Sequence, residues 1–411
     1  MASKKDSDSL NRFREFLRIP SISGNGPIDG SYKAAVSLLS QWMAEVGLTN
    51  IRTIEYVPGK PVLIGSLIGT DPHAPSVLLN GHYDVVPVSD GWSVPSSFDP
   101  PTRSDGKIIA RGTQDMKCVL AQYLESLRRL GQTWKPKRTV HVSFLPDEEV
   151  GGIDGAAKFV DSIEFKNLNV GFALDEGLAN PKNAFHVFYG ERASNWVIIR
   201  TRGPTGHGSR FIMNTAIEKM TRILNRIYMH RSEFHSKCHH TALGDLLSMN
   251  VTAMRAGVPS TALRGGFAIN VIPSEAEIAI DIRVPLSVTD IESIIRNEWI
   301  KDETDVEVDF VDRNDHPDPN LLETPLEDDQ WIKAISAGIK KTLPDVEISF
   351  DCFPAGTDGR FIRRAGIPCI GFSPIRNTPV LLHDIDEHIS EHSFLEGIEV
   401  YMNVLREVVS K

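Results

Sequence analysis

TVHVSFLPDEEVGG, residues 139–152, places an apolar run directly before three adjacent carboxylates, Asp147, Glu148 and Glu149. The run is short, mostly apolar and followed by a turn, which is the pattern of a buried strand. Adjacent negative charges repel one another and are costly to desolvate. The stretch therefore predicts a buried strand that ends either at a solvated surface turn or beside a cation.

Similar apolar runs occur on both sides of this stretch, and amphipathic segments separate them. Strands are predicted in VLIGSLIG (62–69), SVLLNGHYDVV (76–86) and VGFALDEG (170–177), and helices in YKAAVSLLSQWMAEVG (32–47) and DMKCVLAQYLESLRRLG (115–131). Gly47 is a plausible end for the first of these helices. Alternating strands and helices are typical of the α/β class with a parallel or mixed sheet.

From about residue 190 the order of elements changes. Strand, helix, strand, strand, helix and strand are predicted in NWVIIRTRG (195–203), NTAIEKMTRILNRIYMHRSEF (214–234), LLSMNVTAMRAG (246–257), EAEIAIDIRVP (275–285), SVTDIESIIRNEWI (287–300) and DVEVDFVD (305–312). This β-α-β-β-α-β order is that of a split βαβ sandwich. The helix in 287–300 is expected to begin on a Ser or Thr cap.

A Pro- and Asp-rich linker follows, and then the α/β pattern returns with a helix near 327–342, a strand at 367–373 and a last helix from about 391. We therefore predict one mixed-sheet α/β domain, formed by residues 1–189 and 313–411. An α+β domain is inserted into it at residues 190–312.

Composition and charge exclude several classes of protein. The 411-residue chain has a formal net charge of -10 and scattered basic residues, which disfavours nucleic acid and anionic membranes as partners. No apolar run approaches the roughly 18 residues of a membrane span, and the N-terminus lacks a secretory pattern. The four cysteines, Cys118, Cys238, Cys352 and Cys369, form no disulfide framework, so a reducing compartment, the cytoplasm, is expected.

Residues that could bind a metal or act as acid and base recur at the ends of the predicted strands. They are His82, Asp84, Glu148, Glu149, Asp175 and Glu176, and Asp115 adds a further carboxylate at the start of a predicted helix. In an open α/β sheet the ligand crevice lies beyond the carboxyl ends of the strands. Any one of these acids could be an ordinary solvated turn residue, but such recurrence at strand after strand favours a single site.

Spacing adds detail to this site. His82 and Asp84 are two residues apart and point to the same side of an extended backbone, as a metal-bound His and its carboxylate partner do. Glu148 and Glu149 are neighbours, so their side chains should diverge, one as a metal ligand and the other as a general base. The metal cations would then relieve the repulsion between the carboxylates.

Five segments together resemble the M20 family of dizinc peptidases. They are NGHYDVVP (80–87), RGTQDMKC (111–118), PDEEVGG (146–152), TGHGSRF (205–211) and PVLLHDIDE (379–387). Within that family, ALDEGLANP (173–181), FYGER (188–192) and GFSPIRNTPVLLHD (371–384) resemble the aminoacylases. The resemblance covers nearly the whole chain, with the segments in the same order.

The resemblance implies a role for each of these residues. His82 and Glu176 would bind one zinc ion, with Asp175 as the alternative to Glu176. Asp115 would bridge the two zinc ions, and Glu149 and His383 would complete the second. Asp84 would orient His82, and Glu148 would take the proton from the attacking water. The ligand types suit Zn²⁺, though Co²⁺ and Mn²⁺ would also fit.

The inserted domain is implied to take part as a dimerisation and lid domain. His207 would reach the site of a partner subunit and stabilise the oxyanion there. Asn270 and Arg283 would contact substrate, and Arg360 would bind the carboxylate of an amino acid. Taken alone, each of these residues could equally be a plain loop or strand residue.

The implied function is zinc-dependent hydrolysis of N-acyl-L-amino acids, chiefly N-acetyl, by a homodimer with two zinc ions per subunit. A dizinc dipeptidase or exopeptidase is the alternative, and an inactive binding protein is a third. Three other segments are weaker candidates for a binding site. HISEH (388–392) is interpreted as a solvated helix start and HSKCHH (235–240) as a polar interhelix loop. GNGPIDG (24–30) follows no strand and contains Pro27, which disfavours a dinucleotide-binding loop.

Overall fold

The computed structural model describes residues 3–71, 73–100, 105–237, 241–261, 265–288, 290–312, 322 and 326–411. The chain forms two compact units. The first contains Met1–Gly190, Pro319–Asp351 and Thr357–Lys411, and the second contains Glu191–Asp318 and Cys352–Gly356. None of the helices in the described ranges is long and apolar enough to cross a membrane.

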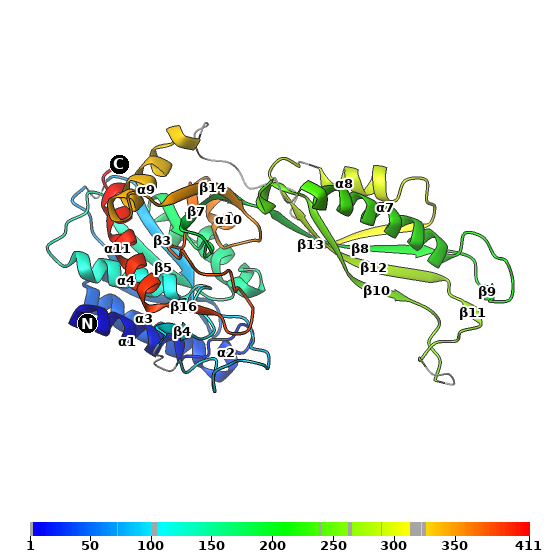
Figure 1. Ribbon diagram of the computed structural model, residues 1–411, viewed down its shortest axis with the longest axis horizontal. Helices are drawn as coiled ribbons and strands as arrows, with labels where there is room; N and C mark the ends of the chain where they lie inside the picture. Colours follow the sequence, from blue (N-terminus) through cyan, green and yellow to red (C-terminus); the bar gives the residue numbers. More distant parts are fainter. Residues whose placement is uncertain are drawn as a thin grey trace. The chain divides into compact units, whose positions relative to one another are not determined.

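An eight-stranded mixed sheet forms the centre of the first unit, in the order β1-β2-β5-β3-β6-β15-β7-β14 (Figure 1). β3 lies between β5 and β6 and runs parallel to both, whereas β2 runs antiparallel to its two neighbours, β1 and β5. The strands are β1 (Thr49–Val57), β2 (Lys60–Leu67), β3 (Ser76–His82), β5 (Val140–Leu145), β6 (Val170–Asp175), β7 (Ala184–Glu191), β14 (Glu347–Phe353) and β15 (Cys369–Gly371); β4 (Lys107–Ile109) pairs separately with β16 (His388–Ser390).

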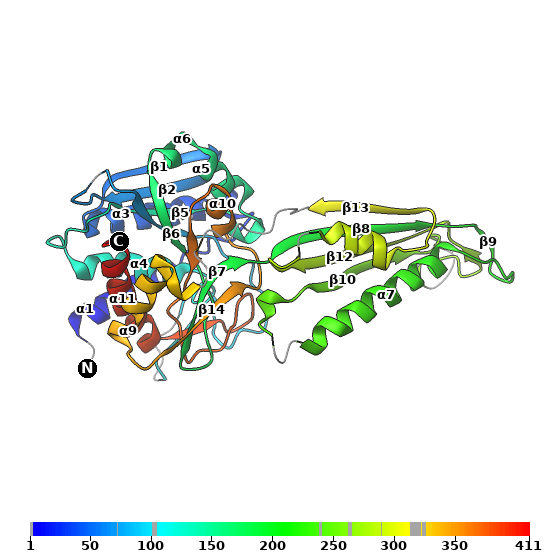
Figure 2. The ribbon, with the colours of Figure 1, turned by 90° about the horizontal axis from the view of Figure 1, so that it is seen from above.

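Helices cover both faces of this sheet (Figures 1 and 2). Residues of β3 alternate between two apolar cores, since Val77 and Leu79 pack into one and Leu78 into the other. The first core lies under α1 (Lys4–Leu17), α3 (Ser31–Val46), α4 (Lys117–Leu130), α9 (Gln330–Thr342) and α11 (Glu391–Val408), and the second under α5 (Lys158–Asp161), α6 (Ile163–Lys166) and α10 (Gly359–Arg364). The short α2 (Gly26–Asp29) precedes α3.

Most of the predicted elements are present, and two of their predicted ends are confirmed. Gly47 ends α3 in the left-handed conformation, at φ 91°, which glycine adopts without steric cost. Ser390 caps α11 by accepting the N–H of Ser393. β1 was not predicted, because most of its residues are exposed or half-buried and it lacks an apolar run.

The second unit is a four-stranded antiparallel sheet with helices on one face, in the order β10-β12-β8-β13. Its elements follow the predicted β-α-β-β-α-β order: β8 (Ala193–Arg202), α7 (Ala216–Lys237), β10 (Ser248–Ala256), β12 (Glu275–Val284), α8 (Ile291–Ile294) and β13 (Val306–Asp312). A small pair, β9 (Gly206–His207) with β11 (Val271–Ile272), lies at one end of this unit (Figures 1 and 2).

The second helix of this unit differs from its prediction in two respects. Asp290, and not a Ser or Thr, caps it by accepting the N–H of Ser293. The helix is also shorter than predicted, since after α8 the backbone forms a π-helical turn at Ile295–Trp299. The turn buries Trp299, whose indole N–H donates to His230 of α7.

Candidate metal centre

Three parallel strands bring candidate ligands to one rim of the first sheet. β3 ends at His82, which lies level with Leu145, the last residue of β5. The chain leaving β5 carries Glu148, and Glu176 directly follows β6. Because the three strands are neighbours that run the same way, their side chains meet beyond the carboxyl edge.

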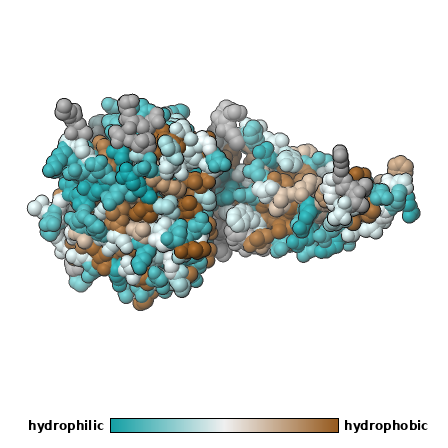
Figure 3. All heavy atoms as spheres, turned by 90° about the horizontal axis from the view of Figure 1, so that it is seen from below, coloured by the Kyte–Doolittle hydropathy of each residue, from teal (hydrophilic) through white to brown (hydrophobic). Residues whose placement is uncertain are grey.

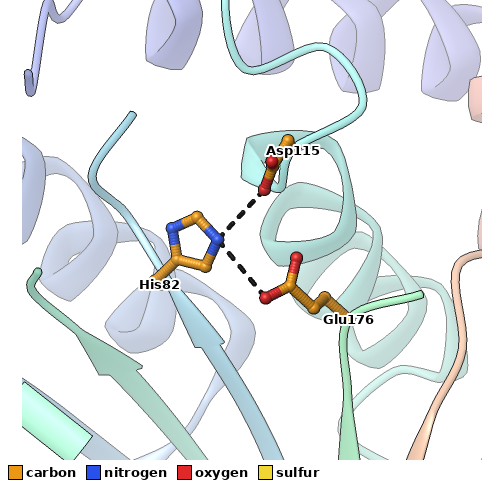
Figure 4. Close-up of side chains that lie close together, drawn as sticks. All are labelled: His82, Asp115 and Glu176. Atoms are coloured by element: carbon orange, nitrogen blue, oxygen red, sulfur yellow. Dashed lines mark hydrogen bonds and ion pairs between the residues drawn. The ribbon is translucent and has the colours of Figure 1, made fainter. Parts of the chain in front are cut away.

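The first group consists of His82, Asp115 and Glu176, all buried (Figure 4). Nε2 of His82 lies 3.1 Å from Oδ1 of Asp115 and 3.7 Å from Oε1 of Glu176. Nδ1 of the same ring lies 3.0 Å from the backbone carbonyl of Asp84, which can only accept a hydrogen bond. Nδ1 therefore carries the proton in the neutral ring, which leaves the Nε2 lone pair free for a metal.

The second group consists of Asp115, Glu149 and His383. Nε2 of His383 lies 3.2 Å from Oδ2 of Asp115 and 2.9 Å from Oε2 of Glu149. The two oxygens of Asp115 thus serve different histidines, one in each group. The His383 side chain is 54% exposed, so this group can be reached from solvent.

Glu148 belongs to neither group. Its Oε2 lies 3.9 Å from Nε2 of His82, whereas neighbouring Glu149 reaches His383, so the two side chains diverge. Asp175 also lies outside both groups, and its Oδ1 accepts a hydrogen bond from Nδ2 of Asn80. Of the two adjacent acids at the end of β6, Glu176 is therefore the one in position to bind a metal.

Negative charge exceeds positive charge at this rim. Burial, together with the charge of Glu176, raises the pKa of Glu148 well above its usual value. Burial and neighbouring Asp115 raise the pKa of Glu149 to about 7 and that of Glu176 well above normal. Hydrogen bonds to Asp115 and Glu149 raise the pKa of His383 to about 10.

These features fit a pair of divalent cations. The ligand atoms of each group lie within 4.8 Å of one another, and the His and carboxylate mixture suits Zn²⁺. Among the described residues nothing hydrogen-bonds the buried Oε1 of Glu149. Buried oxygens without a partner are costly, and a bound cation would remove that cost.

Asp84 connects the two predicted sets of ligands. Its carboxylate accepts the backbone N–H groups of Glu148, at 3.2 Å, and Glu149, at 3.3 Å, and the hydroxyl of Ser23, at 2.7 Å. Its Oδ1 lies 3.4 Å from Nδ1 of His82. The carboxylate of Asp84 therefore holds the turn after β5, while its backbone carbonyl orients the His82 ring.

Asp147, the first acid of the turn, does have a cation beside it. Nζ of Lys60 lies 2.5 Å from its Oδ2, and the same amino group also pairs with Asp154. The hydroxyl of Tyr32 donates to Oδ1 of Asp147 at 2.6 Å. Lys60 therefore ties both ends of the turn that carries Glu148 and Glu149. The local sequence around Lys60 does not reveal this role, because its partners Asp147 and Asp154 lie 87 and 94 residues away.

Comparison with known proteins places the chain in a family. The profile of Peptidase family M20/M25/M40 matches residues 78–407. The chain belongs to peptidase family M20. Aminoacylase-1 of Dictyostelium discoideum is 40% identical to it over 421 residues, covering 100% of both chains.

Solved structures similar to this M20 chain include the di-peptidase Dug1p of Saccharomyces cerevisiae, with a TM-score of 0.70 at 15% identity over 98% of this chain and 96% of that one. They also include the YXEP protein of Bacillus subtilis, described as a dinuclear metal binding peptidase, with a TM-score of 0.66 at 14% identity over 99% of each chain. At these identities the structures share the M20 fold.

The second unit of this M20 chain separates the residues predicted there. Asn270 lies beside His207, because its carbonyl accepts the N–H of Gly208 and β11 pairs with β9. Arg283 lies near the end of β12, where a pocket of about 350 Å³ opens, and makes a two-point ion pair with Asp281. From Glu275 to Arg283 the extended strand spans on the order of 26 Å.

Arg360 in the first unit contacts backbone rather than open space. Its guanidinium donates to the carbonyls of Gly151 and Thr357, each at 2.7 Å, and stacks on the ring of Phe361. Gly151 belongs to the turn that carries the two glutamates, so Arg360 supports that turn.

None of the described residues in the weaker candidate segments belongs to either group. His388 and Ser390 form β16, and His392 lies in the first turn of α11. GNGPIDG contains α2 and a left-handed Gly30, as a turn would. In HSKCHH, residues 235–237 end α7, and 238–240 lie outside the described residues.

We expect the affinity of this M20 chain for Zn²⁺ to rise with pH. The pKa of Glu149 is raised to about 7 and that of His383 to about 10, so below pH 7 a metal must displace protons. Raised pKa values also mean that the metal-free fold binds more protons than the unfolded chain, so its free energy of unfolding falls as pH rises. Thermal unfolding with and without Zn²⁺ should show a larger metal-dependent gain at pH 8 than at pH 6. An equal gain at both values would contradict these pKa directions.

Proposed function

We propose that this chain hydrolyses N-acyl-L-amino acids, chiefly N-acetyl, to a carboxylate and a free L-amino acid. The observation that carries the proposal is the 40% identity to aminoacylase-1 over the full length of both chains. The dimetal geometry supports it, because both candidate groups contain a complete ligand set.

The cofactor proposed is two Zn²⁺ per subunit, one held by His82, Asp115 and Glu176 and the other by Asp115, Glu149 and His383. When bound, such cations would polarise an amide carbonyl. They would also lower the pKa of water, so that hydroxide is available near neutral pH to attack that carbonyl. The name of the YXEP relative, a dinuclear metal binding peptidase, supports the count of two.

Glu148 is proposed as the general base. It takes the proton of the attacking water and returns it to the leaving amine. Its position supports this role, since its side chain is only 11% exposed and lies beside the first group without belonging to it. The raised pKa of Glu148, caused by burial and by Glu176, favours a group that must hold a proton for part of the cycle.

The second unit is proposed as a dimerisation and lid domain. An N-acyl amino acid spans about 7 Å, so the two ends of β12 cannot both contact one substrate. If His207 and Asn270 serve one site, Arg283 of the same unit serves another. Two copies of the chain satisfy this requirement, with His207 stabilising the oxyanion in the partner subunit.

Exposed apolar side chains support a homodimer. Phe211, Phe267 and Ile269 flank the β9–β11 pair and are exposed, and hydrophobic surface interrupts the polar surface of the second unit (Figure 3). Isolated exposed apolar side chains are ordinary, but several near one short strand pair favour a contact surface. The described cysteines, Cys118, Cys352 and Cys369, are all buried, and four cysteines in 411 residues make no disulfide framework, which supports the cytoplasm as the proposed compartment.

We expect His207→Ala and Glu148→Gln to complement each other. In a mixed dimer one site has an intact base and also receives an intact His207 from the other subunit. Mixing the two inactive variants after mild dissociation should therefore restore up to about a quarter of wild-type activity, because about half of random dimers are mixed and each has one intact site. No recovery, despite dimers in sedimentation, would contradict a His207 shared between subunits.

The proposed reaction is tested with two substrates that differ by one ammonium group. N-acetyl-L-methionine and glycyl-L-methionine share the scissile amide and the side chain. An acylase site has no anion for the ammonium, and burying it unpaired costs several kcal/mol, so kcat/KM should favour the acetyl substrate by at least about 100-fold. Chelation should remove activity on both. A higher kcat/KM for glycyl-L-methionine would contradict the acylase proposal and indicate a dipeptidase.

A further inference from the structure

A buried ion pair joins the two segments that supply Asp115 and His383. Nη1 of Arg111 lies 2.8 Å from Oε2 of Glu387, and both side chains are at most 2% exposed. Arg111 follows β4 and Glu387 precedes β16, so the antiparallel pairing of these two strands sets the two residues beside each other. A buried ion pair is retained at little cost only where further hydrogen bonds satisfy it.

Glu387 receives those further hydrogen bonds from the backbone that leads to Asp115. Its Oε2 accepts the N–H of Gly112 at 3.0 Å. Its Oε1 accepts the N–H of Gln114 at 2.6 Å and that of Asp115 at 3.2 Å. One carboxylate therefore holds the backbone conformation of the whole turn before Asp115, without touching either carboxylate oxygen of Asp115 itself.

The segment that carries His383 is in turn held by a residue of the Asp115 segment, Arg111. His383 and Asp386 both have positive φ, 62° and 54°, a conformation that is unfavourable for residues other than glycine. Arg111 donates to the carbonyl of Asp384 at 3.2 Å. Such a backbone keeps its shape only where its surroundings determine it.

Gln114 ties the two segments a second time. Its Nε2 donates to the carbonyls of Pro379, at 3.0 Å, and His388, at 2.8 Å, and its Oε1 accepts the N–H of Leu381 at 3.0 Å. Its bonds therefore reach the chain on both sides of His383. The segment is thus fixed to the Asp115 turn by side chains of that turn.

We propose that Glu387, paired with Arg111, is a positioning residue that sets the distance between Oδ2 of Asp115 and Nε2 of His383 and so assembles the second metal group selectively. The inference rests on the proposed dimetal site. The first group depends less on this contact, because His82 and Glu176 are placed by β3 and β6. Loss of Glu387 should therefore weaken one metal site more than the other.

Glu387→Gln is the sharpest variant. Each oxygen of Glu387 already accepts hydrogen bonds from donors, so either orientation of the new amide directs its NH₂ group at another N–H. Residues that hold metal ligands in place typically contribute 10–100-fold to metal affinity. We expect the second Zn²⁺ to bind about 10–100-fold more weakly and the first to change by less than about threefold.

The matched control is Glu125→Gln. Glu125 is also a buried carboxylate paired with an arginine, Arg12, but it lies on α4 away from the ligands. The Glu125→Gln substitution should lower the unfolding temperature and leave both Zn²⁺ affinities unchanged. If Glu387→Gln fails to fold, Gln114→Ala removes the second tie without leaving an unpaired charge, and the same selective loss is expected.

The measurement is a competition titration of the metal-free full chain with Zn²⁺ and a chromophoric chelator, together with its unfolding temperature. A wild type with two sites and a Glu387→Gln or Gln114→Ala variant with one intact and one weakened site would support the proposal. Equal weakening of both sites, or none, would overturn it and leave the proposed function standing. A wild type that binds fewer than two Zn²⁺ would overturn the proposed dimetal site, on which this inference rests, whereas the substrate comparison above tests the proposed reaction.

Discussion

Glu148→Gln is expected to lower kcat/KM for N-acetyl-L-methionine by about 10²–10⁴-fold, the usual contribution of a general base. The amide keeps the shape of the carboxylate but cannot accept the proton of the attacking water. Because Glu148 lies outside both ligand groups, metal content should stay at the wild-type value.

The same variant should unfold at the wild-type temperature or above it when metal-free. Burial and Glu176 raise the pKa of Glu148, so the fold disfavours its charge, and a neutral amide removes that cost. Steady-state kinetics, metal analysis and calorimetry measure the three quantities. Glu149→Gln is the control, since it should lose metal as well as activity. Activity above about a tenth of wild type would rule out Glu148 as the base.

Asp115→Ala is expected to remove both metals, whereas His383→Ala should remove only the second. Asp115 contributes one oxygen to each group, and His383 belongs to one group alone. Losing a ligand should weaken binding by more than the 10–100-fold typical of residues that merely support ligands.

Metal analysis after gel filtration, together with competition titration, separates the two variants. Retention of one tightly bound Zn²⁺ by His383→Ala is the expected pattern, and its affinity should resemble that of the first site in wild type. If Asp115→Ala keeps a metal as tightly as His383→Ala does, Asp115 does not bridge the two sites.

The short-range pattern of the sequence was sufficient for the fold class. Apolar runs ending at His82, before Glu148 and before Glu176 predicted buried strands of a parallel or mixed sheet, because a strand covered on both faces must be apolar along its length. The edge strand β1 was missed for the same reason, since its exposed residues leave no such run.

The choice between Asp175 and Glu176 needed tertiary structure. They are adjacent acids at the end of one strand, and the local sequence gives no criterion for choosing between them. Packing separates them, because Asp175 bonds to Asn80 of the neighbouring strand while Glu176 turns toward His82. Register between strands decides which side chain faces which neighbour, and register is not a local property.

The sequence by itself determined the fold class, and its resemblance to the M20 family implied His82, Asp115, Glu149 and His383 as candidate ligands, with Glu176 or Asp175 left open. Only the tertiary structure revealed what holds that set in place. Lys60 supports the turn that carries Glu148, and Glu387 accepts a hydrogen bond from the backbone of Asp115, 272 residues earlier in the chain. Periodicity records which face of an element is buried, whereas a contact between distant turns depends on how the whole sheet brings them together.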